Sequence, residues 1–201
     1  MIDQSRSAGR HRAAPSSTHD VPSTLDEFNR ADDTAASDLL GACLDIPAWV
    51  ERVSSGRPYP DLTSLHAAGA AASEGVTWDQ VVGALDRHPR IGEKKAAVAG
   101  TSTESAWSAD EQAGLQSAGA STSSTGRTSA DDPAVAIAEG NRAYEERFGF
   151  LFLICAAGLS AEQILADLNR RLTHDAEAEK PVVTGELKKI AALRLAKAVV
   201  T

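Results

Sequence analysis

The chain has 201 residues, of which 42% are hydrophobic and 4% aromatic, and its formal net charge is -8 at pH 7. This length is sufficient for one domain with a sizeable core, and the acidic balance argues against a nucleic acid partner. The sequence has no run of about 18 apolar residues and no apolar stretch near its start, so we expect neither a membrane span nor a secretion signal.

Residues 1–22 mix Ser, Arg, His and Pro without periodicity, which predicts a disordered tail that carries no site. Residues 23–201 are predicted to form one domain, because helical periodicity begins directly after Thr24, a residue suited to an N-cap. In the first half of this domain, apolar spacing and capping signals predict helices over 25–29, 34–44, 47–55, 62–72 and 77–87.

In the second half, the same signals predict helices over 93–100, 109–118, 133–147, 161–172 and 184–199. Residues 116–132 are rich in Ser, Thr, Gly and Asp and are predicted to form a flexible loop. The apolar run 148–157 finds no second strand pattern to pair with, so we expect a buried extended segment or a helix start. These patterns predict an all-α fold, a compact single-domain bundle of about eight or nine helices.

The two cysteines, Cys43 and Cys155, lie in apolar surroundings far apart in the sequence and lack the spacing of metal ligands. Buried, reduced thiols in a cytoplasmic protein without a bound metal are therefore expected.

A histidine followed by proline, His88-Pro89, stands at the end of the helix predicted over 77–87. A residue before proline is disfavoured in the α region, so the helix should end at His88. The negative end of the helix dipole favours a protonated imidazole there. We therefore hypothesise that His88 is a proton donor held in place by Pro89; the alternative is a histidine that only caps a helix end.

The string Ser108-x-x-Glu111-Gln112 opens the helix predicted over 109–118. Ser-x-x-Glu is the pattern of a capping box, in which hydroxyl and carboxylate bond to backbone N–H groups of the first turn. The same helix start leaves further N–H donors that could hold a ligand. Capping and ligand binding are compatible, and the sequence leaves both open.

Taken in order, a series of short motifs between Leu25 and Leu195 resembles the 2-oxo-4-hydroxy-4-carboxy-5-ureidoimidazoline (OHCU) decarboxylases of urate degradation. The motifs are Leu25-x-x-x-Asn29, Trp49, Arg57-Pro58-Tyr59, His88-Pro89-Arg90-Ile91-Gly92, Ser108-x-x-Glu111-Gln112, Asn141-x-x-Tyr144, Arg147-Phe148-Gly149-Phe150 and Lys188-Lys189-Ile190-x-x-x-Arg194-Leu195. Each motif alone is weak, and it is their ordered set that is specific.

The resemblance implies which residues form the site. His88 and Glu111 would be catalytic, and the substrate would be contacted by Pro89, Ser108, Gln112 and Arg194. The stretch after Phe-Gly-Phe would line the pocket, partly through its backbone, and comprises Phe152, Leu153, Ile154, Cys155 and Ala156. For Arg194 the alternative is a surface arginine on the last helix.

The resemblance also implies the reaction, a decarboxylation of the ureidoimidazoline to S-allantoin without any cofactor, by a homodimer. Two alternatives remain open from the sequence. One is a hydrolase or racemase of a related ureide that uses His88 and Glu111 as base and acid. The other is a catalytically silent helical interaction protein in which the motif residues are structural.

Overall fold

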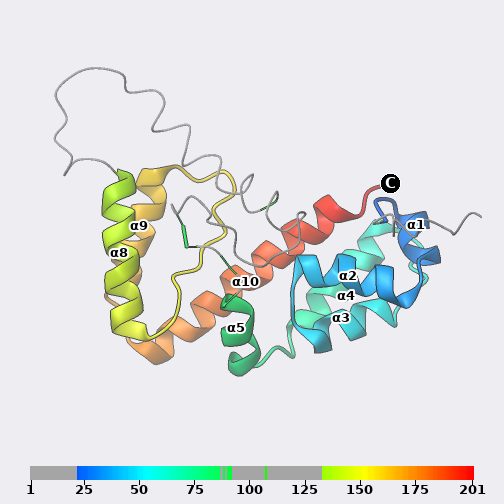
Figure 1. Ribbon diagram of the computed structural model, residues 1–201, viewed down its shortest axis with the longest axis horizontal. Helices are drawn as coiled ribbons and strands as arrows, with labels where there is room; N and C mark the ends of the chain where they lie inside the picture. The colour runs from blue at the N-terminus through cyan, green and yellow to red at the C-terminus, as the bar shows by residue number, and fades with distance from the viewer. Residues whose placement is uncertain (1–21, 87, 89, 92–106, 108–132) are drawn as a thin grey trace, which may run out of the picture.

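One long helix, α10, runs the length of the molecule, and the other helices are arranged along its course (Figure 1). The computed structural model describes residues 22–86, 88, 90–91, 107 and 133–201. Its helices are α1 (Leu25–Arg30), α2 (Asp33–Cys43), α3 (Pro47–Ser54), α4 (Leu62–Ser73), α5 (Trp78–Leu85), α8 (Pro133–Phe148), α9 (Ala161–Arg171) and α10 (Ala176–Ala198). These ranges contain no β-strand, and the predicted all-α class is confirmed. Residues 1–21 of the predicted tail, the helices predicted over 93–100 and 109–118, and the predicted loop 116–132 lie outside the described residues.

The helices α1 to α4 gather at one end of α10, α8 and α9 stand at the other, and α5 lies between (Figure 1). α10 contacts α2, α4 and α5 directly, whereas α8 packs mainly on α9. At its far end α10 returns to the first helix, where Val200 forms an isolated parallel bridge with Thr24. No helix within the described ranges is long and apolar enough to cross a membrane.

Local capping explains where most of these helices begin. The Thr24 hydroxyl accepts a hydrogen bond from the Glu27 N–H, and the Glu27 carboxylate accepts one from the Thr24 N–H, which completes a capping box. A capping box formed by Ser160 and Gln163 likewise begins α9. Such caps depend only on nearby residues, which is why the sequence locates these starts well.

Two predicted boundaries are wrong. α5 ends at Leu85 rather than His88, because the chain tightens into a turn in which the His88 N–H donates to the Leu85 carbonyl over 2.9 Å. α10 begins at Ala176 rather than at residue 184, with Asp175 as its N-cap. Pro181 lies inside this helix near its start, where it removes a single backbone hydrogen bond and is tolerated.

Buried side chains form two hydrophobic cores. The main core lies among α1 to α5 and α10 and includes Phe28, Leu40, Trp49, Leu65, Leu187 and Leu195. The second core lies around α8 and α9 and consists of Ile91, Ile137, Tyr144, Phe152, Ile154, Ala156, Ala161, Ile164 and Leu168. The site residues expected after Phe-Gly-Phe fall where these two cores meet.

Residues 151–156, here called the linking segment, contribute alternately to the two cores. Leu153 is buried in the main core, with Leu151 and Cys155 packed partly against it. Phe152, Ile154 and Ala156 are buried in the second core. Alternation with a period of two is the property of an extended chain, so the extended segment is confirmed over the helix start. Neither cysteine forms a disulfide, but burial holds only for Cys43, since Cys155 is half-buried.

A buried charged cluster fastens the linking segment to the surrounding helices. The Arg171 and Glu179 side chains are both 0% exposed, and Arg171 Nε donates to Glu179 Oε1 over 2.6 Å. A second guanidinium nitrogen donates to the Leu153 carbonyl over 2.8 Å, and the third donates to the Tyr144 hydroxyl. The Tyr144 hydroxyl donates to Glu179 over 2.5 Å, and His174 Nδ1 lies 2.6 Å from the other carboxylate oxygen.

The environment fixes the protonation of two members of this cluster. Burial, with the hydrogen bond to Glu179, raises the pKa of Tyr144 well above its usual range, so the phenol remains a donor. Burial tends to lower the pKa of Arg171, but Tyr144 and Glu179 outweigh it and the net shift is upward. The guanidinium therefore remains charged and needs its acceptors.

We predict that Glu179→Gln lowers the free energy of unfolding by about 3 kcal/mol, because it leaves a buried guanidinium without its nearest anion. Urea denaturation measures this loss. Glu177→Gln is the matched control on the same helix, since Glu177 is 82% exposed in its pair with Lys180 and should contribute less than about 1 kcal/mol. Equal, small losses in both variants would contradict the importance assigned to the cluster.

Candidate active site

His88 lies in the turn that follows α5 and is half-buried. Its Nδ1 is 2.9 Å from the carbonyl oxygen of Ala84, in the last turn of α5. A carbonyl oxygen only accepts hydrogen bonds, so Nδ1 carries the hydrogen and donates it. This bond orients the ring and leaves Nε2 as the nitrogen that can take up or deliver a proton.

Two residues of α8 hold the chain just after His88. Asn141 Nδ2 donates to the carbonyl of Ile91 over 2.9 Å, and both groups are buried. One turn further along the helix, the Glu145 carboxylate accepts two hydrogen bonds from Arg90, over 2.6 and 2.8 Å. The turn that carries His88 is thus fixed to α5 on one side and to α8 on the other.

The linking segment is anchored along one edge. The Leu153 carbonyl accepts from Arg171, and the Cys155 N–H donates to the Glu186 carboxylate over 2.9 Å. In an extended chain the backbone groups of alternate residues point to the same edge. The N–H and C=O groups of Phe152 and Ile154 therefore point to the opposite edge, and within the described ranges these groups form no hydrogen bonds.

Hydrophobic contacts bring the His88 turn and the linking segment together. Ile91, three residues after His88, shares the second core with Phe152, Ile154 and Ala156. On the other side, Leu85 of α5 shares the main core with Leu153. The imidazole and the unbonded backbone edge thus belong to the same junction between the two cores.

Arg194 lies on α10 and is only 3% exposed. The alternative of a surface arginine is therefore wrong. Burial of a guanidinium costs free energy unless the group is paired with an anion. A buried arginine is therefore suited to contact with an anionic group.

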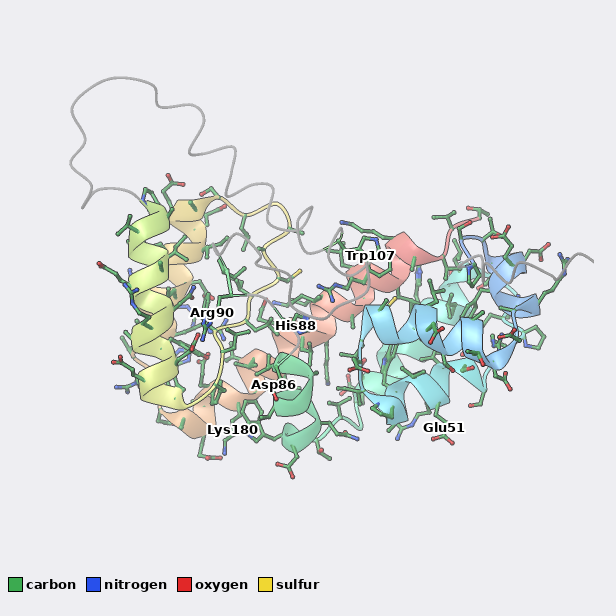
Figure 2. The ribbon with its side chains drawn as sticks, viewed as in Figure 1. Glu51, Asp86, His88, Arg90, Trp107 and Lys180 are labelled. Carbon is green, nitrogen blue, oxygen red and sulfur yellow. The ribbon has the colours of Figure 1, made fainter. Side chains whose placement is uncertain are left out.

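The structure does not place the other expected site residues. Pro89, Ser108, Glu111 and Gln112 lie outside the described residues. Trp107, directly before Ser108, packs partly against the main core. In Figure 2 the labelled Trp107 and His88 both appear in the middle part of the view.

A cavity of about 220 Å³ lies elsewhere, between α4 and α10. Its lining includes Trp49, His66, Ser73, Lys188 and Leu195 and none of the residues expected to form the site. Among the described residues, no group of three or more His, Cys, Asp or Glu side chains gathers in a way that could hold a metal ion.

The sequence did not identify three residues that shape the junction, namely Arg171, Glu179 and Glu186. Asn141 and Tyr144 were present as a motif, and their spacing of three residues places them on one side of α8. The charged residues gave no such signal, because each one sits in a stretch of helix that also carries exposed charges. A buried charge is distinguished from a solvated one only by partners that are remote in sequence.

We predict that neutral His88 carries its hydrogen on Nδ1, the reverse of the tautomer that an exposed histidine prefers. Two-bond nitrogen–proton correlation spectra of the nitrogen-labelled protein distinguish the two ring nitrogens directly. His88→Asn, which deletes one set of signals, supplies the assignment. Observation of the hydrogen on Nε2 would show that the bond to the Ala84 carbonyl does not form.

Comparison with known proteins identifies the family. The family model for OHCU decarboxylase matches residues 29–196. A 2-oxo-4-hydroxy-4-carboxy-5-ureidoimidazoline decarboxylase from Haloferax volcanii is 30% identical, over 86% of this chain and 94% of that protein. A uric acid degradation bifunctional protein from Bacillus subtilis is 26% identical, over 86% of this chain and 32% of its own length.

A solved structure has the same fold. The crystal structure of an OHCU decarboxylase in the presence of (S)-allantoin aligns with a TM-score of 0.59 and 24% identity, over 80% of this chain and 96% of that chain. Together with the sequence matches, this shows that the chain belongs to the OHCU decarboxylase family.

Proposed function

We propose that the protein is a carboxy-lyase that converts 2-oxo-4-hydroxy-4-carboxy-5-ureidoimidazoline to S-allantoin in the degradation of urate. The observation that carries the proposal is the match of this family over residues 29–196, which includes the turn with the half-buried His88. The geometry supports it, because Nδ1 is occupied by the Ala84 carbonyl and Nε2 is left for proton transfer.

The substrate itself supplies most of the driving force. Its carboxylate and hydroxyl share one ring carbon, which is next to electron-withdrawing nitrogen. As the bond to the carboxylate breaks, CO2 leaves and the electron pair moves into the ring. The hydroxyl loses its proton and becomes the carbonyl of allantoin, while the neighbouring carbon receives a proton. The protein must orient the carboxylate, stabilise the developing charge and deliver this proton to one face.

We assign His88 to the proton delivery and Glu111 to hydrogen bonds from ureido or ring N–H groups. Ser108 and Gln112 would contact carbonyl or hydroxyl groups, and the planar guanidinium of Arg194 suits the carboxylate. Pro89 would contact the substrate from the His88 turn.

The remaining pocket residues, Phe152, Leu153, Ile154, Cys155 and Ala156, would line the site through the linking segment. Its edge at Phe152 and Ile154 offers both N–H and C=O groups, the complement of a ureido group, which has both donors and an acceptor.

We further propose that the enzyme acts without a cofactor, as a homodimer, in the cytoplasm. The chemistry supports the first point, because none of its steps requires a metal or an electron carrier. Activity in the presence of a chelator tests cofactor independence, and sedimentation equilibrium tests the dimer.

Two alternative functions would give different results in the same assay. A related hydrolase would release ammonia rather than CO2, and a silent interaction protein would not exceed the spontaneous rate.

We predict that His88→Asn retains the fold but lowers the rate by about 10²-fold or more, because the amide can replace Nδ1 as donor and has no counterpart of Nε2. Circular dichroism of freshly generated substrate measures both the rate and the handedness of the allantoin. His66→Asn, the same change on α4 away from the junction, is the control and should behave as the parent. Normal turnover of His88→Asn with S-allantoin as product would remove His88 from the mechanism.

A further inference from the structure

Among the described residues, two side chains outside the expected site hold the backbone of the linking segment. They bind it at Leu153 and at Cys155, two residues further on. Arg171 binds the Leu153 carbonyl and Glu186 binds the Cys155 N–H, over 2.8 and 2.9 Å. These anchors come from α9 and α10, so the segment is fixed between two different helices. Both anchors act on backbone groups rather than on side chains.

The two anchors differ in their surroundings. Arg171 is wholly buried, and besides the Leu153 carbonyl it contacts the adjacent residue, since its guanidinium lies 4.5 Å from the centre of the Phe152 ring. Glu186 is 14% exposed, and its second oxygen accepts from Lys189 over 2.6 Å. Lys189 is itself 65% exposed, so this pair satisfies the outer oxygen and leaves the inner one for the segment.

Anchoring one edge determines where the other edge points. In an extended chain the backbone groups of neighbouring residues alternate in direction, so fixing Leu153 and Cys155 also fixes Phe152 and Ile154. Without the anchors, rotation of the peptide planes would move the N–H and C=O groups of these two residues away from a common direction. The binding free energy of a ligand that bonds to that edge would then include the cost of ordering it, and the affinity would be lower.

We propose that Arg171 and Glu186 are positioning residues, which hold the backbone edge of Phe152 and Ile154 in the orientation that binds the ureido end of the substrate. This inference rests on the proposed function and adds two residues that touch no substrate. The segment then acts as a preformed binding edge, and its anchors control substrate affinity more than the proton transfer at His88.

Glu186 provides the sharper test, because Arg171 variants also break the buried cluster. Glu186→Ala removes the acceptor of the Cys155 N–H and should raise KM about tenfold, the equivalent of one hydrogen bond, with kcat within about threefold of the parent. Glu186→Gln keeps an acceptor oxygen at the same position and should restore KM to within about threefold. Lys189→Met removes only the outer partner of Glu186 and serves as the matched control, with parental KM.

Amide hydrogen exchange, followed by NMR at Cys155, reports the anchor without reference to activity. Exchange should be about tenfold faster in Glu186→Ala and near parental in Glu186→Gln and Lys189→Met. Unchanged exchange in Glu186→Ala would show that Glu186 does not anchor the segment. Faster exchange with a parental KM would show that the anchored edge does not bind substrate.

Two further results would also overturn the positioning role. Equal KM increases in Glu186→Ala and Glu186→Gln would assign the effect to the carboxylate charge rather than to the bond. A fall in kcat alone would place the effect in the chemical step. A parent enzyme without turnover would instead overturn the proposed function, and with it this inference.

Discussion

The arrangement of α8, α9 and the linking segment depends on one charge, the guanidinium of Arg171. It is completely buried, and a buried cation is tolerated only when its hydrogens meet acceptors. Those acceptors come from α8, through Tyr144, from α10, through Glu179, and from the linking segment, through the Leu153 carbonyl. Satisfying one side chain therefore draws three parts of the chain to α9, and the second core closes around them.

The linking segment gains its importance from this arrangement. Because its side chains enter two cores alternately, it cannot slip by one residue without placing the side chains of each face in the wrong core. The His88 turn is tied to the same junction through Ile91 and Arg90, both of which are held by α8. A histidine and a row of backbone groups are thus held by side chains that need no contact with any substrate.

Much of the fold could be predicted because its signals are local. Thr24 and Ser160 locate helix starts through residues only three positions away, and Pro47 begins α3 as expected of a proline at the first position. The start of α10 was missed because Pro181 resembles a break, whereas Asp175 and the packing of the helix outweigh the lost hydrogen bond. The extended state of the linking segment remained undecided in the sequence, because its alternation is visible only once two separate cores exist.

The site was predictable in part, for the same reason. His88 stood out because of the proline beside it, but the Ala84 bond that orients its ring follows from the turn geometry and not from the motif. Other residues of the resemblance prove to be structural: Asn29 exchanges two hydrogen bonds with the backbone of Tyr59, and Trp49 Nε1 donates to the Gly69 carbonyl. A sequence motif does not separate such contacts from chemistry.

The bridge between Thr24 and Val200 has a consequence for the growing polypeptide. The Leu25 N–H donates to the Val200 carbonyl and the Val200 N–H donates to the Ser23 carbonyl, both over 2.9 Å. α1 has six residues, too few to be stable alone, and it is completed by a partner that is synthesised much later than α1 itself. α10 also supplies one wall of the main core, so a nascent chain that lacks it exposes the apolar faces of α2 and α4. Burial of these faces in the growing chain therefore waits until α10 has been synthesised.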